Sequence, residues 1–350
     1  MNAALIDEVA KTVLYEGYTL YPYRPSVKNR QRWTFGGLVP RSYSEATSGS
    51  DAWTMRTECL VRGNSETVID VEVRFLHLID RRVGVFDRPQ FEIGDDAEPP
   101  REFVDSLTVG DRRLQAWQEA EERRVPLGKR ELHSLMKRPD DCDFGFPACR
   151  ATEPVRDPIG TIPAALVRTQ YVVLGTARVI AEAVATDLYR LRLDIENRTP
   201  LPQPDSLSRD EAMLHALVST HSILSVHGGE FVSSIDPPED CREHAAACQN
   251  IGAWPVLVGN DGDTSAMLSS PIILYDYPAI ASESPGDFFD NLEIDEILTL
   301  RIQTLTHEEK ADAAAVDERV RALLQRTESM SPSVMQGLHG TFRGLKRSVP

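Results

Sequence analysis

Long apolar runs are missing from this sequence. No segment approaches the ~20 consecutive apolar residues that a helix needs to cross a bilayer. The start of the chain, from Met1 to Glu8, also has no basic stretch followed by an apolar block, which a secretory signal peptide would contain. We therefore expect a cytoplasmic protein with no membrane span.

Cysteine is scarce. Five cysteines occur in 350 residues, at positions 59, 142, 149, 241 and 248. A number this small and odd excludes a disulfide framework as the main support of so long a chain, so reduced thiols are expected.

Basic residues are outnumbered by acidic ones. The 38 Lys and Arg residues face 54 Asp and Glu residues, which gives a formal net charge of −16. An acidic surface repels phosphate backbones and anionic lipids. General binding to nucleic acid is therefore not expected, although a local basic patch is compatible with the total.

The motifs of the common enzyme classes are also absent. The chain contains no Gly-x-Ser-x-Gly elbow, P-loop, Gly-x-Gly-x-x-Gly turn, His-Glu-x-x-His pair or complete EF-hand loop. His221 and His227 are of a type that transfers protons near neutral pH, but a spacing of six residues does not place them on one helical face. We assign no catalytic residue and expect a non-enzymatic protein.

Apolar residues are present in patterns typical of strands. Hydrophobic residues make up 41% of the chain, which is enough for a sizeable core. Apolar and polar residues alternate in the manner of half-buried strands, most clearly at 68–79 and 188–197. Further strands are predicted at 12–21, 33–39, 52–61, 170–180, 255–258, 272–275 and 298–305. Gly63 and Asn64 indicate a hairpin turn between two of these strands.

Other segments indicate helices. A charged stretch at about 114–137 is one, and the capping boxes Ser208-Arg-Asp-Glu211 and Thr306-His-Glu-Glu309 predict two more. The first of these has an apolar stripe that stops at Gly228-Gly229, and the second ends at about residue 326. The pattern as a whole predicts an α+β protein, with an antiparallel β layer or sandwich, helical insertions and a mixed α/β C-terminal region. We place a β-rich domain at 1–205, with a helical or irregular insertion at about 86–160, and the mixed region at 206–350.

One predicted helix, at 236–252, carries potential metal ligands. Asp236 is a favourable N-cap and Pro237 suits the first helical position. Offsets of three, four and seven residues then place Cys241, His244 and Cys248 on one face. Thiolate and imidazole groups are ligands that zinc, nickel and iron accept.

A closed tetrahedral site would need a fourth ligand. The candidates are His221, His227, Cys142 and Cys149. The alternative is a packed helix without metal, because buried cysteine often behaves as a small apolar residue and three alanines precede Cys248.

A basic loop near the N-terminus interleaves cations with aromatic residues. It contains Arg24, Lys28, Arg30, Arg32 and Trp33, and no acidic residue occurs from Gly17 to Ser44. Such a loop can hold a phosphate, a nucleotide or single-stranded nucleic acid by charge and stacking. The acidic segment 276–296, which has no Lys or Arg, offers internal pairing instead, and we favour a structural or partner-docking role.

Three stretches, at 15–25, 29–36 and from 271–278 through 295–300, resemble a bacterial protein family that is associated with nickel–iron hydrogenase gene clusters. The resemblance implies an accessory role in building or supporting such an enzyme, with a hydrogenase subunit as the partner. We therefore expect an accessory or assembly protein that docks a partner protein. The alternatives are a metal-dependent enzyme or metal carrier that uses the Cys/His/Cys face, and a nucleotide-binding module that uses the basic loop.

Overall fold

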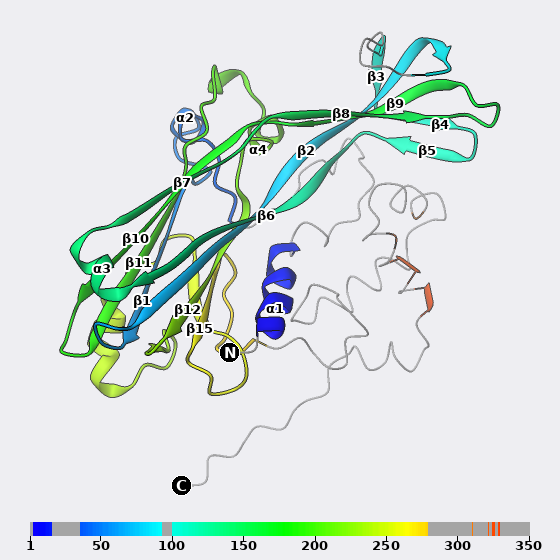
Figure 1. The fold of residues 1–350 in the computed structure, drawn as a ribbon. Helices are drawn as coiled ribbons and strands as arrows, with labels where there is room; N and C mark the ends of the chain where they lie inside the picture. The colour runs from blue at the N-terminus through cyan, green and yellow to red at the C-terminus, as the bar shows by residue number, and fades with distance from the viewer. Residues whose placement is uncertain are drawn as a thin grey trace.

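The computed structural model describes residues 3–15, 36–92 and 100–278, together with residues 310, 321, 324, 325, 328 and 329. Two antiparallel sheets face each other (Figure 1). The first sheet consists, in spatial order, of β13 (Glu230–Val232), β1 (Thr54–Arg62), β11 (Leu188–Asn197), β10 (Val173–Ala183) and β7 (Asp140–Phe146). The second consists of β14 (Trp254–Leu257), β15 (Ala266–Ser270), β12 (Val218–His227), β2 (Val68–Gln90), β9 (Ile162–Gln170) and β8 (Cys149–Val155).

Two more strands, β6 (Trp117–Glu131) and β3 (Glu102–Val104), pair with β2, and β4 (Ser106–Val109) pairs with β5 (Arg112–Gln115). The helices are short except for the first. They are α1 (Ala3–Tyr15), α2 (Arg41–Ala46), α3 (Leu132–Lys137), α4 (Arg209–Met213) and α5 (Arg242–Ala246), with 3-10 turns at Pro204–Ser206 and Glu239–Cys241. The described residues between 310 and 329 are helical, and among the residues described no helix is long and apolar enough to cross a membrane.

The core lies between the two sheets and follows the predicted alternation. Val71, Val73 and Phe75 of β2 are buried against Leu193 and Ile195 of β11 in one hydrophobic cluster. Successive side chains of a strand point to opposite faces, so the charged residues between them face outward. The predicted antiparallel β layer is thus confirmed, and the strands pack face to face as in a sandwich.

Beyond the sandwich, β2 continues into a projecting arm. This strand is 23 residues long, and its second half pairs with β9 and β3 while β8 joins the far side of β9. Figure 1 shows these strands and the β4–β5 hairpin leaving the sandwich together. The arm has a small core of its own, formed by Val83, Val109, Leu114, Val155, Ala164 and Leu166.

The prediction of a helical insertion at 86–160 is wrong, because the described part of this segment is mostly strand. The charged stretch at 114–137 forms β6, and only Leu132–Lys137 is helical. Pro126 does not suit a helix interior but is tolerated at a bulge on an edge strand. Here Val71 pairs with Gly128 and Glu72 with Pro126, and Gly128 has a φ of +82° that favours glycine.

A second predicted helix is also replaced by a strand. The capping box at Ser208 is confirmed, since Ser208 and Glu211 cap each other, but the helix ends at Met213. Residues from Val218 onward form β12 because this segment is sandwiched between β2 and β15 and rich in β-branched residues.

Three local predictions are corrected as well. Gly63 and Asn64 do not close a hairpin: β1 and β2 belong to different sheets, and the amide of Gly63 donates to the carbonyl of Asp187. The strand predicted at 272–275 is absent from the described residues there, and the strand lies earlier, at Ala266–Ser270. Residues 12–15 belong to helix α1, which packs its apolar face on the second sheet.

In both sheets, strands that precede residue 205, the predicted domain boundary, pair with strands that follow it. β13 pairs with β1, and β12 pairs with β2. The predicted strand at 298–305 lies outside the described residues.

Candidate functional site

The segment with the predicted metal ligands is less helical than expected. A 3-10 turn at Glu239–Cys241 leads into α5, which ends at Ala246. Tertiary hydrogen bonds replace the helical ones after this point, because Asn250 accepts from the amide of Glu58 at 2.7 Å and donates to its carbonyl at 3.2 Å. The chain thus runs along β1 instead of continuing the helix predicted to 252.

Cys241 is fully buried against Leu60, Leu188 and Val232. Nη2 of Arg62 donates a hydrogen bond to its sulfur at 3.0 Å. Burial nevertheless raises the pKa of the Cys241 thiol, so the thiol form is favoured at neutral pH.

Cys248 lies after α5 and packs at the edge of the same cluster. Its thiol donates to the carbonyl of His244 at 3.6 Å, and burial raises its pKa too. His244 is half-buried. In the described ranges, no group of three or more His, Cys, Asp or Glu side chains is placed to hold a metal ion.

The proposed fourth ligands are found elsewhere. Cys142 is on β7, half-buried against the main core, and Cys149 begins β8 in the other sheet, where it is exposed. His221 is fully buried on β12, and His227 is exposed at the end of that strand. The basic loop residues Arg24, Lys28, Arg30, Arg32 and Trp33 lie outside the described residues.

The His221 side chain is uncharged at neutral pH. Burial lowers its pKa to about 4, and Nδ1 lies 3.0 Å from the carbonyl oxygen of Ser219, so this nitrogen carries the proton. Ser219 has a φ of +53° at a β-bulge, which turns the strand locally. No partner for Nε2 occurs in the part of the chain that is described.

The burial of a second histidine, His77, was not predicted from the sequence. His77 is fully buried near the base of the arm, and Nε2 donates to the carbonyl of Tyr171 at 3.0 Å. Burial and the nearby Arg123 lower its pKa to about 4. The Tyr171 ring in turn contacts the ring of His215, with centroids 4.8 Å apart. The alternation of β2 indicated a polar face for His77, which gave no signal of burial.

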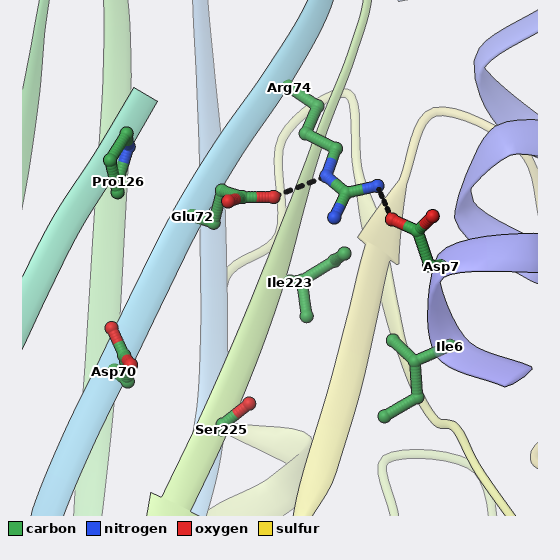
Figure 2. Close-up of a pocket in the computed structure, with 8 residues that line it drawn as sticks. All are labelled: Ile6, Asp7, Asp70, Glu72, Arg74, Pro126, Ile223 and Ser225. Carbon is green, nitrogen blue, oxygen red and sulfur yellow. Dashed lines mark hydrogen bonds and ion pairs between the residues drawn. The ribbon is translucent and has the colours of Figure 1, made fainter. Parts of the chain in front are cut away.

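One cavity lies between α1 and the outer face of the second sheet (Figure 2). It measures about 230 Å³ and is lined by Ile6, Asp7, Asp70, Glu72, Arg74, Pro126, Ile223 and Ser225. Nη1 of Arg74 donates to Asp7 at 2.7 Å, and its Nε donates to Glu72. Arg74 is almost fully buried, and it clamps α1 to the sheet with its charge balanced by Asp7, Glu72 and, at 4.0 Å, Glu122.

A second cavity, of about 240 Å³, lies on the outer face of the first sheet and is lined by charged residues of β1, β10 and β11. Arg56 and Arg192 share Asp194, each at 2.7 Å, and Arg190 pairs with Glu182 at 2.8 Å. Opposite charges across neighbouring strands are typical of a sheet face that meets solvent. The lining of the first cavity carries three carboxylates, of Asp7, Asp70 and Glu72, and one cation, that of Arg74.

Another charged cluster lies where the arm leaves the sandwich. Glu119 of β6 accepts from Arg81 of β2 at 2.8 Å and from Arg168 of β9 at 2.7 Å. Arg168 also donates to Glu153 of β8 at 2.8 Å. These four residues, which we call the brace, connect four strands at the base of the arm. Arg81 is almost fully buried, so its charge depends on this partner.

Comparison with known proteins gives no assignment. No protein-family model matches the chain, and no curated protein matches its sequence.

Proposed function

We propose that this chain is a non-enzymatic accessory or assembly protein that docks a partner protein through its β arm. The observation that carries the proposal is the brace of Arg81, Glu119, Glu153 and Arg168, which fixes a projecting sheet to the sandwich. A rigid projection loses little conformational freedom when it binds, and this favours association.

The nature of the partner is proposed from the sequence. The stretches at 15–25, 29–36 and from 271–278 through 295–300 resemble a family associated with nickel–iron hydrogenase gene clusters. We therefore propose a hydrogenase subunit as the partner, with the accessory protein acting during assembly or maintenance of that enzyme.

The test is affinity purification of the tagged full-length chain from its native cells, together with deletion of its gene. We expect a hydrogenase component to co-purify and hydrogenase activity to fall on deletion. If no hydrogenase component is recovered and activity is unchanged, the hydrogenase assignment fails. If no protein of any kind co-purifies specifically, the docking role fails as well.

A second candidate is a metal carrier or metal-dependent enzyme. It is favoured by one observation: Cys241 and Cys248 belong to the same small cluster, with His244 between them in sequence. Metal analysis of protein purified without a histidine tag distinguishes the two functions. Stoichiometric zinc, nickel or iron that is lost in the Cys241→Ser, Cys248→Ser variant would support the carrier.

A further inference from the structure

The second cavity, on the outer face of the first sheet, is lined by residues of three neighbouring strands. In the register of these strands, Glu58 of β1 is opposite Arg192 of β11, and Arg192 is opposite Ile180 of β10. Ala247 and Gln249, from the segment that follows α5, complete the lining on another side. The volume of about 240 Å³ is below the roughly 300–1,000 Å³ of clefts that hold drug-sized ligands, so an occupant has to be small.

Two arginines that line this cavity share one carboxylate. Nε of Arg56 donates to one oxygen of Asp194, and Nε of Arg192 donates to the other, each at 2.7 Å. Arg178, which is opposite Asp194 on β10, is paired with Asp141 instead. In the described ranges, the terminal nitrogens of Arg56 and Arg192 have no hydrogen-bond partner. Asp194 therefore balances only one of the two positive charges that it contacts.

The third arginine of the lining has partners of its own. Nη1 of Arg190 donates to Glu182 at 2.8 Å, and the guanidinium group also lies beside the thiol of Cys248. Glu182 is thus engaged with Arg190. It does not supply the negative charge that Arg56 and Arg192 lack.

Glu58 is the remaining carboxylate of the lining. It is 6% exposed, and its Oε2 accepts a hydrogen bond from the amide of Gln249 at 2.8 Å. Among the residues that the structure describes, no cation forms an ion pair with Glu58, although Arg192 is its direct neighbour across the two strands. A buried carboxylate without a cation is unfavourable, so Glu58 lacks a partner that the described chain does not provide.

The cavity thus has an excess positive charge at Arg56 and Arg192 and an unpaired negative charge at Glu58. A simple anion would be repelled by Glu58, and a simple cation would be repelled by the arginines. A molecule that carries both charges compensates both sides. Residues directly opposite on antiparallel strands have Cβ atoms about 4.5–5.5 Å apart, so the two charges of that molecule have to be close together.

We infer that this cavity binds a small α-amino acid, with the carboxylate of the ligand at Arg56 and Arg192 and its ammonium group at Glu58. Guanidinium groups bind carboxylates through paired hydrogen bonds, and an ammonium group donates to carboxylate oxygens. The two charges of an α-amino acid are attached to one carbon atom, which meets the requirement for short separation. The volume of the cavity and the apolar wall at Ile180 favour a small side chain, such as that of glycine, alanine or serine. This binding is independent of the proposed docking through the arm.

The first test compares ligands that carry one or both charges. Glycine, L-alanine and L-serine carry both, propionate carries the carboxylate alone, and ethylamine carries the ammonium group alone. Calorimetry with the full-length chain measures their affinities, and thermal unfolding measures the stabilisation that binding causes. We expect at least one of the three amino acids to bind and to raise the unfolding temperature, and propionate and ethylamine to bind at least about tenfold more weakly.

The second test uses variants of the full-length chain. Glu58→Gln removes the negative charge and retains an oxygen for the amide of Gln249, and we expect it to weaken amino-acid binding at least about tenfold. Glu196→Gln is the matched control: Glu196 lies on the same face of β11, is paired with Arg198 at 3.0 Å and does not line the cavity. Binding by the control should stay within about twofold of the original protein.

A third variant leaves every charge in place. Ala247→Phe puts a bulky side chain on the lining at an exposed position, and we expect it to weaken binding about tenfold as well. Thermal unfolding without ligand is the folding control, because none of the three substitutions removes a described ion pair of a buried arginine.

Four results would overturn the inference. If propionate binds as tightly as the amino acids, the cavity is an anion site and Glu58 has no part in binding. If ethylamine binds as tightly, the arginines have no part. If Glu58→Gln or Ala247→Phe folds and binds the amino acid as the original protein does, the ligand lies elsewhere. If none of the three amino acids binds, the cavity holds no ligand of this class. The docking function is unaffected by each of these results.

Discussion

At the scale of single residues, Arg74 joins helix α1 to the second sheet. It is 5% exposed, and it joins Asp7 of α1 to Glu72 of β2. The Arg74 and Arg124 cations lower the pKa of the Asp7 carboxyl in spite of partial burial, which alone would raise it. The ion pair between Arg74 and Asp7 therefore stabilises the packing of α1 on the sheet only while both residues are present.

We predict that Arg74→Met destabilises the protein by about 3 kcal/mol, because it removes the buried cation that Asp7, Glu72 and Glu122 share. Arg124→Met is the matched control, since Arg124 also donates to Asp7, at 3.0 Å, but has a side chain that is 42% exposed. This control should cost about 1 kcal/mol or less. Urea unfolding measures both values, and equal losses would contradict the role of burial.

A second residue-scale prediction concerns pH. His221 and His77 have pKa values of about 4 in the folded protein, lowered mainly by burial from the ordinary histidine pKa of about 6.5. Between these two pH values the unfolded chain binds more protons than the folded one. Stability is therefore fully present above about pH 6.5 and falls as the pH is lowered toward 4, by roughly 3 kcal/mol for each histidine.

The measurement is urea unfolding at several values between pH 7 and pH 4.5. In His221→Asn the amide can still donate to Ser219 but does not titrate, so we expect a shallower loss of stability with acid than in the original protein. A change that is equally steep in both proteins would show that His221 does not contribute. The variant also separates histidine from carboxylates such as Asp141, whose lowered pKa moves their titration to more acidic conditions.

At the scale of elements, the brace determines whether the arm is a rigid extension or a loose one. We predict that Glu119→Gln lowers amide-exchange protection in the arm, at about 81–86 and 162–168, by about tenfold. The neutral amide no longer compensates the buried Arg81. Hydrogen exchange followed by mass spectrometry locates the change.

The matched control for the brace is Glu182→Gln. Glu182 also pairs with an arginine, at 2.8 Å, but it lies on the sandwich and its side chain is 60% exposed. Protection in the arm should be unchanged in this variant. A uniform loss of protection across the molecule in Glu119→Gln would argue that the network supports the whole fold and not the arm alone.

The strands that the sequence predicted correctly are those in which apolar and charged residues alternate. In β11, and in β2 from Val68 to Val73, the apolar side of the strand is buried and the charged side is more exposed. From Val73 to Leu78 every residue of β2 is buried. β12 was mistaken for a helix because both of its faces are covered, so Leu224 and Ser225 are both buried and no alternation remains. The capping box at Ser208, which precedes β12, marks where a helix begins but carries no information on where that helix ends.

The arm was missed for a different reason. The charges of β6 find their partners on other strands, as Glu119 does with Arg168, and such partners cannot be identified from one segment. The shared face of Cys241, His244 and Cys248 was predicted from helical spacing. That spacing does not apply to Cys248, because α5 ends at Ala246.

At the scale of the whole molecule, the two halves of the chain build the same sheets. β12 lies along the first half of β2, and β13 completes the edge of β1. Helix α1 rests on residues that come from the second half, including Ala266 and Leu268 of β15. The main core likewise combines Val71 and Leu193 with Leu224 and Met267.

This arrangement predicts that residues 1–205 do not fold when they are expressed alone. Without β12, the backbone edge of β2 has no partner and its apolar face is left partly uncovered, which favours aggregation. We expect the fragment to be insoluble or to lack a cooperative thermal transition, and the intact chain to unfold its described sheets in one transition. Co-expression with residues 206–350 should restore solubility, because the missing strands are then supplied in trans. A soluble fragment 1–205 with a sharp transition of its own would instead mean that β2 and β1 close the core without their later neighbours, and that the second half is added to a finished domain.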